Sequence, residues 1–289
     1  MNVGSDDSVV DLITLALRED LGLSGDVTSE AFISQDSIAK ATIRAREKCV
    51  SSGLTTARDV FLRVDPRLKV SILCSEGEIL SVGSPLMEIK GSTRSILSAE
   101  RTALNFLGRL CGIATLAGRY ADELRGMDVQ LLDTRKTTPG WRFLEKRAVK
   151  AGGGMNHRMG LFDAVLVKDN HIASLGDLSL LQPVIAELRD QYPDLPIEIE
   201  ADTLEQVATL LAYTSVDVIL LDNMPPDSLR KAVLMRQAKA PWIKLEASGG
   251  ITLESIRLIA ETGVDRISVG ALTHSAISTD LSLELQHAV

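Results

Sequence analysis

The chain has 289 residues, of which 45% are hydrophobic and 24% charged, and its formal net charge is −8. This length and composition are typical of a soluble globular protein with one large domain or two modest ones. Only 3% of the residues are aromatic and the charge balance is acidic. Nucleic-acid binding needs a basic face with stacking rings, so we expect no nucleic-acid partner.

The location of the protein is indicated by its first residues and its cysteines. The chain starts with an acidic stretch and has no apolar run long enough for an export signal or a membrane span. Cys49, Cys74 and Cys111 are scattered without metal-ligand spacing, which favours reduced thiols. We therefore expect a cytoplasmic protein with no membrane partner.

The first third of the chain predicts helices packed on a small antiparallel sheet. Apolar residues at helical spacing predict a helix over residues 8–21, and a second helix is expected over 55–64. Residues 95–125 predict one long helix or two in succession, which we expect to join two domains. Short alternating runs between glycines and prolines predict strands at 39–46, 68–74 and 79–82.

From residue 129 onward, strands alternate with helices, which is the sequence pattern of parallel β/α units. Polar residues stand at the carboxyl ends of these strands, where β/α barrels build their active sites. Any one of them, taken alone, is equally well explained as a helix cap or a loop residue. The sequence does not show eight strands, so we predict an incomplete α/β barrel with six strands and room for a seventh. The six strands are at 129–133, 164–169, 197–202, 216–222, 243–248 and 266–270.

The segment 133–171 is rich in basic residues although the chain as a whole is acidic. This reversal of charge predicts a pocket for a multiply charged anion. We assign Arg135, Lys136, Arg158 and Lys168 to the pocket, because they stand beside glycines or at strand ends. Helical spacing instead puts several of the remaining four on a solvated face. These are Arg142, Lys146, Arg147 and Lys150.

Two histidines, His157 and His171, lie in the same basic segment. Each is a candidate acid–base group or a donor to a carboxylate, and no combination with serine or cysteine predicts a nucleophilic triad. We favour His157 as a donor that binds the anion.

Acidic residues follow the basic segment on the predicted strands. A period of two puts Glu198, Glu200 and Asp202 on one face of a strand. Carboxylates held among apolar strands bind a metal or accept hydrogen bonds from hydroxyls. We therefore propose Glu200 and Asp222 for sugar hydroxyls and Mg²⁺, and leave open which of Glu198, Glu200 and Glu246 faces the ligand.

Glycines follow the last two predicted strands. Backbone N–H groups exposed by glycines before a helix bind phosphate, and we expect one such helix to begin near Thr252. Ordinary turn chemistry is the alternative explanation for these glycines. The predicted phosphate-binding residues are Ser248, Gly249, Gly250, Gly270 and Ala271.

Six stretches of the sequence carry a resemblance to a known family. They are 98–105 (SAERTALN), 133–140 (DTRKTTPG), 152–160 (GGGMNHRMG), 167–171 (VKDNH), 221–223 (LDN) and 247–250 (ASGG). With these stretches the chain resembles the quinolinate phosphoribosyltransferases, also called nicotinate-nucleotide pyrophosphorylases (carboxylating). The resemblance covers essentially the whole chain and is most specific in the central segment.

The resemblance implies conversion of quinolinate and 5-phosphoribosyl 1-diphosphate to nicotinate mononucleotide, diphosphate and CO₂, with Mg²⁺, in NAD biosynthesis. It places Lys136, Glu200 and Asp222 at the reacting groups and makes Glu200 and Asp222 the metal ligands. It also implies a homodimer in which Arg101 reaches the partner's pocket. The implied substrate-binding residues are Arg101, Arg135, His157, Arg158 and Lys168.

The resemblance also implies the domain organisation. An N-terminal α/β sandwich would comprise residues 1–113 and be completed by 272–289, and an α/β barrel with parallel strands would comprise 114–271. Two alternatives to the implied activity remain. One is a related phosphoribosyltransferase acting on nicotinate or another aromatic acid, and the other is a non-catalytic phosphosugar-binding protein.

Overall fold

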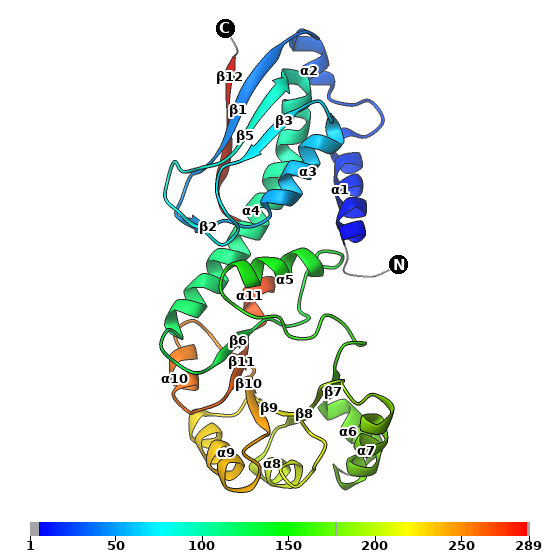
Figure 1. The fold of residues 1–289 in the computed structure, drawn as a ribbon, viewed down its shortest axis with the longest axis vertical. Helices are drawn as coiled ribbons and strands as arrows, with labels where there is room; N and C mark the ends of the chain where they lie inside the picture. The colour runs from blue at the N-terminus through cyan, green and yellow to red at the C-terminus, as the bar shows by residue number, and fades with distance from the viewer. Residues whose placement is uncertain (1–5, 177, 288–289) are drawn as a thin grey trace. The chain divides into compact units, whose positions relative to one another are not determined.

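A computed structural model describes residues 6–176 and 178–287 (Figure 1). Its contacts divide the chain into two compact units. The predicted domain boundary falls after residue 113 and leaves 137–153 in the barrel, whereas the contacts group 137–153 with the first unit. The first unit contains Met1–Gly118, Thr137–Gly153 and Leu272–Val289, and the second contains Arg119–Lys136 and Gly154–Ala271.

The first unit is built on an antiparallel sheet whose edge strand comes from the end of the chain. The strand order is β12-β1-β5-β3, and a separate ladder joins β2 to β4. β12 pairs with β1 in a register that places Leu285 opposite Ala41. The strands are β1 (Ile38–Ala45), β2 (Cys49–Val50), β3 (Lys69–Ile72), β4 (Ile79–Leu80), β5 (Pro85–Ser92) and β12 (Leu281–His287).

The helices predicted at 8–21, 55–64 and 95–125 are all present in this unit, whereas the short helix Val27–Phe32 was not predicted. The segment expected to form one helix or two is a single helix of 31 residues, because its apolar side chains keep helical spacing without a proline or a capping glycine. The helices are α1 (Asp6–Leu21), α2 (Val27–Phe32), α3 (Leu54–Val64), α4 (Thr93–Glu123) and α5 (Arg142–Ala151).

Glycines on α4 allow the returning chain to pack directly on the helix. A Cβ atom added to Gly112 would lie 2.0 Å from the carbonyl oxygen of Ile277, which is closer than any side chain tolerates. One turn earlier, the carbonyl of Gly108 accepts a hydrogen bond from the backbone of Thr279 at 2.9 Å. Because Gly108 and Gly112 have no side chains, the segment that leads into β12 can pack against the backbone of α4 at these two positions.

A buried ion pair ties α4 to α5. The Nη2 atom of Arg109 lies 2.9 Å from Oε1 of Glu145, whose side chain is fully buried. Glu145 also accepts hydrogen bonds from the backbone and the hydroxyl of Thr138. Arg109 donates to the carbonyl oxygens of Thr273 and Ala276. Glu145 and Arg109 therefore hold three segments of this unit together.

The spacing of the basic residues in α5 led us to expect them on a solvated face, but two of the four are wholly or partly covered by the protein. Arg147 and Lys150 are exposed, but Lys146 is fully buried and Arg142 is half-buried. Helical spacing alone places a side chain on a face, and only the packing of this unit determines that the face of Lys146 is covered.

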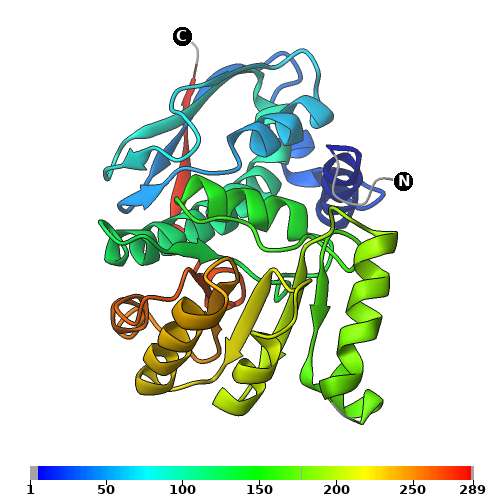
Figure 2. The same cartoon turned by 60° about the horizontal axis from the view of Figure 1, so that its bottom comes forward.

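The second unit contains the six predicted strands as one parallel sheet (Figure 2). Its order is β6-β11-β10-β9-β8-β7, so the first strand lies beside the last. This is the order of a β/α barrel that is open between β6 and β7, and the mixed α/β fold class is confirmed. The strands are β6 (Gln130–Leu132), β7 (Val165–Val167), β8 (Ile197–Ala201), β9 (Val218–Asp222), β10 (Lys244–Ser248) and β11 (Arg266–Ser268).

Helices connect these parallel strands. No helix among the described residues is long and apolar enough to cross a bilayer. The helices are α6 (Asp169–Leu175), the 3-10 turn η1 (Leu178–Leu180), α7 (Leu181–Gln191), α8 (Leu204–Leu210), α9 (Pro226–Lys239) and α10 (Ile256–Ala260). The last helix, α11 (Ala271–His274), follows β11 and belongs to the first unit from Leu272 onward.

We predict that Arg109→Ala destabilises the protein by about 3 kcal/mol, because the carboxylate of Glu145 stays buried without its cation. The free energy of unfolding from urea titrations measures the effect. Arg58→Ala is the matched control, since Arg58 pairs with Asp59 at the surface. It should cost less than about 1 kcal/mol. An equal decrease in the free energy of unfolding for the two variants would contradict a larger contribution of the Arg109–Glu145 pair.

Candidate active site

The predicted site residues of β8, β9 and β10 lie at one edge of the parallel sheet. β8 pairs with β9 and β9 pairs with β10, all in parallel register. Asp222 lies opposite Ser248, and Glu200 lies opposite Leu220. Because parallel strands end at the same edge, the side chains of Glu200, Asp222 and Ser248 gather there.

Three carboxylates at this edge form what we call the acidic cluster: Glu200, Asp202 and Asp222. Each offers an oxygen, and these oxygens lie within 4.8 Å of one another. Glu200 is buried, Asp202 is exposed and Asp222 is intermediate. Clustered carboxylate oxygens are the ligands that Mg²⁺ and other hard divalent cations prefer. The cluster therefore fits the predicted metal, with Asp202 added to Glu200 and Asp222.

Asp202 was left out of the predicted metal ligands, although the period of two had already placed it on the same face as Glu200. Asp202 was the last residue of the predicted strand 197–202, so the period of two pointed to it as strongly as to Glu200. The strand ends at Ala201, and the backbone N–H of Asp202 donates to Gln206.

Lys168 forms an ion pair with the acidic cluster. Its Nζ lies 3.2 Å from Oε2 of Glu200, so a predicted anion-binding residue contacts a predicted metal ligand. Half of the Lys168 side chain is exposed to solvent. The Lys168–Glu200 pair therefore joins the predicted anion-binding residues to the acidic cluster.

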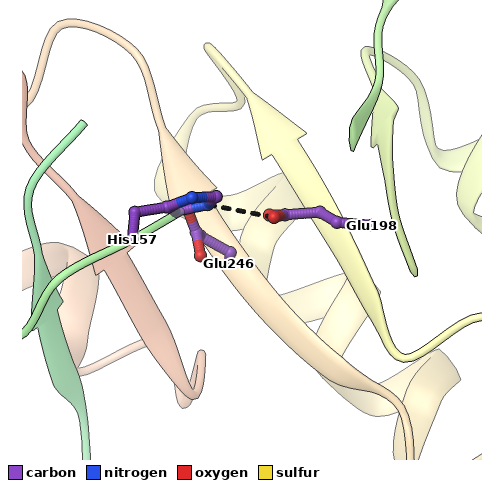
Figure 3. Close-up of side chains that lie close together, drawn as sticks. All are labelled: His157, Glu198 and Glu246. Carbon is purple, nitrogen blue, oxygen red and sulfur yellow. Dashed lines mark ion pairs between the residues drawn. The ribbon is translucent and has the colours of Figure 1, made fainter. Parts of the chain in front are cut away.

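A second group of charged residues includes two buried carboxylates, and we call it the His157 cluster: His157, Glu198, Glu246 and Arg266. Figure 3 shows His157, Glu198 and Glu246. Nε2 of His157 lies 2.9 Å from Oε2 of Glu198 and 3.4 Å from Oε1 of Glu246. Nε of Arg266 lies 3.4 Å from the other oxygen of Glu246. Because Arg266 already supplies a cation here, we assign the metal to the acidic cluster instead.

The charge of His157 follows from these contacts. Burial lowers its pKa, but the nearby carboxylates of Glu198 and Glu246 outweigh burial and raise it to about 9. Burial also raises the pKa of Glu198. With His157 protonated, two positive and two negative charges balance in the His157 cluster.

The backbone N–H of Arg158 competes with a proton for Nδ1 of His157. Its N–H donates to Nδ1 of His157 at 2.8 Å, which requires a ring without a proton on that atom. Charge-assisted contacts are roughly twice as strong as neutral hydrogen bonds. We therefore expect a protonated ring at neutral pH, with the bond from Arg158 given up.

Two arginines of the predicted anion pocket, Arg135 and Arg158, lie close enough for the charge of Arg135 to lower the pKa of Arg158. Burial, and then the positive charge of Arg135, lower the pKa of Arg158. The loop after Arg158 is fixed by Asp163, which accepts from the backbone of Met159 and Gly160. Bringing two guanidinium groups together costs free energy, and an anion placed between them would recover it.

The glycine loop after β10 packs against the end of β9. A Cβ atom on Gly249 would lie 2.2 Å from Oδ1 of Asn223, and Gly249 has a φ of +94°. Asn223 itself has a φ of +51° and donates its backbone N–H to Ser248. Asn223 was not among the predicted site residues, although it belongs to the stretch LDN.

The helix expected near Thr252 begins later, at Ile256. The residues between them form a turn, in which the N–H of Thr252 donates to the hydroxyl of Ser255. That N–H group is therefore used within the chain. The predicted phosphate-binding residues Gly249 and Gly250 remain in the loop between β10 and this turn, and Gly270 and Ala271 follow the neighbouring strand β11.

Three further predicted residues lie outside these clusters. Lys136 is exposed after β6, and its backbone N–H donates to the hydroxyl of Thr134. Arg101 is exposed on α4, in the first unit. Nδ1 of His171 accepts the backbone N–H of Lys168 and caps α6, which explains His171 without an acid–base role. The roles of Lys136 and Arg101 stay predictions.

We predict that the stability of the protein falls as the pH rises from 6.5 to 9. His157 has a pKa near 9 when folded, against 6.5 ordinarily, so its contribution is complete below pH 6.5 and lost by deprotonation above pH 9. Linkage limits the loss to about 3 kcal/mol. Urea titrations across this range measure it. His157→Gln should flatten this slope and His274→Gln should not; an unchanged slope in His157→Gln would contradict the assignment.

Comparison with known protein families covers both units. The family described as quinolinate phosphoribosyl transferase, C-terminal domain, matches residues 113–284, and its N-terminal domain counterpart matches residues 26–111. The nicotinate-nucleotide pyrophosphorylase (carboxylating) of Mycobacterium leprae is 40% identical over 282 residues, which cover 96% of this chain and 98% of that protein. The probable enzyme of the same name from Bacillus subtilis is 40% identical over 267 residues, covering 92% of this chain and 90% of that protein.

Solved structures give the same result. The nicotinate-nucleotide pyrophosphorylase from Francisella tularensis superposes with a TM-score of 0.91 at 36% identity, covering 98% of this chain and 97% of that one. Human nicotinic acid phosphoribosyltransferase has a TM-score of 0.62 at 14% identity, which is a likeness of fold alone. The resemblance seen in the sequence is thereby confirmed, and the chain belongs to the quinolinate phosphoribosyl transferase family.

Proposed function

We propose that the protein is a glycosyltransferase that converts quinolinate and 5-phosphoribosyl 1-diphosphate to nicotinate mononucleotide, diphosphate and CO₂ in NAD biosynthesis. The observation that carries this proposal is the full-length identity of 40% to the carboxylating nicotinate-nucleotide pyrophosphorylase of Mycobacterium leprae. The adjoining cationic and acidic ends of the site supply the chemistry that the reaction needs.

The cationic end would bind quinolinate, which is an aromatic dianion. Arg135, His157, Arg158 and Lys168 are the residues proposed to hold its two carboxylates. Guanidinium groups match carboxylates bidentately, and the mutual repulsion of Arg135 and Arg158 would be relieved by the bound dianion. A substrate with one carboxylate would relieve this repulsion less, which favours quinolinate over nicotinate.

The acidic cluster would face the ribosyl group of the donor. Its members Glu200, Asp202 and Asp222 are the residues that would hold Mg²⁺, which when bound neutralises charge on the diphosphate. Glu200 and Asp222 would also stabilise the positive charge that develops on the sugar as the carbon–oxygen bond breaks. Lys136 lies on the loop after β6 and would contact the donor.

The donor's phosphate oxygens would be bound by the loops that follow β10 and β11. These loops end neighbouring parallel strands, so their backbone N–H groups lie at the same edge as the acidic cluster. The residues proposed for this role are Ser248, Gly249, Gly250, Gly270 and Ala271.

Positioning and electrostatics would perform most of the catalysis. The pyridine nitrogen of quinolinate attacks the anomeric carbon as diphosphate leaves, and this step needs no strong base because the nitrogen carries a free electron pair. The product nitrogen is positively charged, so it stabilises the electron pair left when the adjacent carboxylate departs as CO₂. Cations that fix the ring would therefore serve both steps.

We further propose a homodimer in which Arg101 completes the pocket of the partner subunit. Arg101 is exposed on α4 and belongs to the first unit, whereas the other proposed binding residues belong to the second. Supply by the partner would account for an exposed arginine within SAERTALN, one of the stretches that carry the resemblance to the family. The active unit would then be the dimer, because a lone chain would lack one cation of the pocket.

We predict that the purified protein releases CO₂ from quinolinate only when the phosphoribosyl donor and Mg²⁺ are both present. EDTA should abolish the release, and nicotinate should not be consumed. Arg158→Gln should raise the KM for quinolinate by about tenfold to a hundredfold, which corresponds to one lost charged contact. The control Arg230→Gln, on the exposed face of α9, should leave the KM unchanged. Turnover of nicotinate instead of quinolinate would contradict the proposed function.

A mixing experiment tests the role of Arg101. Arg101→Ala and Arg135→Ala should each be nearly inactive at low quinolinate concentration. After unfolding and refolding together in equal amounts, they should regain about a quarter of the wild-type activity, because half of the dimers are hybrids with one intact site. Each variant refolded alone is the control. No recovery in the mixture would place Arg101 outside the partner's site.

A further inference from the structure

The His157 cluster raises a question that the proposed function leaves open. Glu198 and Glu246 are two carboxylates on strands that flank β9, with exposed fractions of 3% and 0%. Removing a carboxylate from water costs several kcal/mol unless other charges compensate for it. Such residues persist at a buried position when the charge has a use, and neither carboxylate belongs to the acidic cluster.

The partners of the two carboxylates are unusual for groups that serve only stability. Oε1 of Glu198 and both oxygens of Glu246 have no hydrogen-bond partner among residues 6–176 and 178–287. Their charges are balanced by ion pairs with His157 and with Arg266. Carboxylates that merely stabilise a fold normally have their oxygens satisfied, as Asp65 does with Arg67 and Ser95.

Both carboxylates converge on one nitrogen. Nε2 of His157 points between β8 and β10, toward Glu198 and Glu246 (Figure 3). The ring comes from a loop without regular structure, so the contacts with these two strands are what hold it against the rigid sheet. On the other side, the backbone N–H of His157 donates to Asp133 at 2.8 Å. His157 is thereby fixed at both its main chain and its ring.

Fixing His157 also fixes its neighbour Arg158. The two residues are consecutive, so the bond from the His157 main chain to Asp133 and the ion pairs of the His157 ring also restrain the peptide from which the Arg158 side chain starts. Without the two carboxylates, this peptide would lose the restraint that comes through the ring. Displacements of about 1 Å in a binding group are enough to reduce its contribution severely.

We propose that Glu198 and Glu246, with Arg266 as their counter-ion, are positioning residues that hold His157 and Arg158 in place for the aromatic diacid. This assignment rests on the proposed function for the identity of the substrate. The carboxylates act through His157 and do not contact the substrate. Arg266 forms an ion pair with the other oxygen of Glu246, so that β8 and β10 hold one imidazole between them.

The kinetic test uses Glu246→Gln and Glu198→Gln, which preserve shape and remove charge. Each should raise the KM for quinolinate about tenfold, while the KM for the phosphoribosyl donor changes less than about twofold. Asp65→Asn is the matched control, because it removes a buried carboxylate of the first unit far from these strands in the sequence. It should reduce stability and leave both KM values unchanged.

A spectroscopic test needs no turnover, and so it separates this proposal from the proposed function. The chain has only four histidines, so the ¹⁵N ring signals of His157 are assigned by comparison with His157→Gln. In the wild type, His157 should stay doubly protonated well above the pH at which the other rings lose their proton. In Glu246→Gln, the His157 ring should lose its second proton at a lower pH than it does in the wild type.

Two results would overturn the proposal. One is a KM for quinolinate that rises less than twofold in both glutamine variants. The other is a wild-type His157 ring that titrates together with the exposed histidines. If the glutamine variants do not fold, the wild-type spectrum alone gives the answer. Absence of turnover in the wild type would reject the proposed function, and the spectrum would still test the positioning role.

Discussion

The second unit depends on how charge is buried at the carboxyl edge of its parallel sheet. A sheet with helices on its faces offers little water to the side chains between its strands, so each carboxylate there needs a counter-ion. Glu198 and Glu246 receive theirs from His157 and Arg266, and Glu200 receives its own from Lys168. These pairs link the loops carrying His157 and Lys168 to the rigid strands, and they divide the edge into a cationic part and an acidic part.

That division suits a reaction between two anions. Quinolinate and the phosphoribosyl donor repel each other in solution, and bringing their reacting atoms together requires separate compensation of each charge. In the proposed function, cations at Arg135, Arg158 and Lys168 would serve the diacid, whereas the acidic cluster would serve a divalent cation and the positively charged sugar. Lys168 and Glu200, at 3.2 Å, mark where the two parts meet.

The first unit uses buried charge for a different purpose. Arg109 and Glu145 connect α4, α5 and the segment leading to β12, and Thr138 ties the loop after β6 to the same carboxylate. Close approach at Gly112 allows the chain to return and add β12 to a sheet formed by residues far earlier in the sequence. The loop that carries Arg135 and Lys136 is thus followed by Thr138, which is hydrogen-bonded to the fully buried carboxylate of Glu145.

The sequence by itself determined the six parallel strands, the long helix α4 and the residues that gather at the strand ends, because strand and helix periods and the polarity of strand ends are local properties. It also identified the family through short stretches such as DTRKTTPG. Tertiary structure alone decided that Lys146 is buried, that Asp202 joins the acidic cluster, and that the helix after the glycine loop begins at Ile256 rather than near Thr252. It also decided that Glu198 and Glu246 meet at one histidine, since they stand on strands 48 residues apart in the chain that only the pairing with β9 brings to either side of the ring. The physical reason is that a side chain's charge and burial depend on neighbours distant in sequence, which local periodicity does not encode.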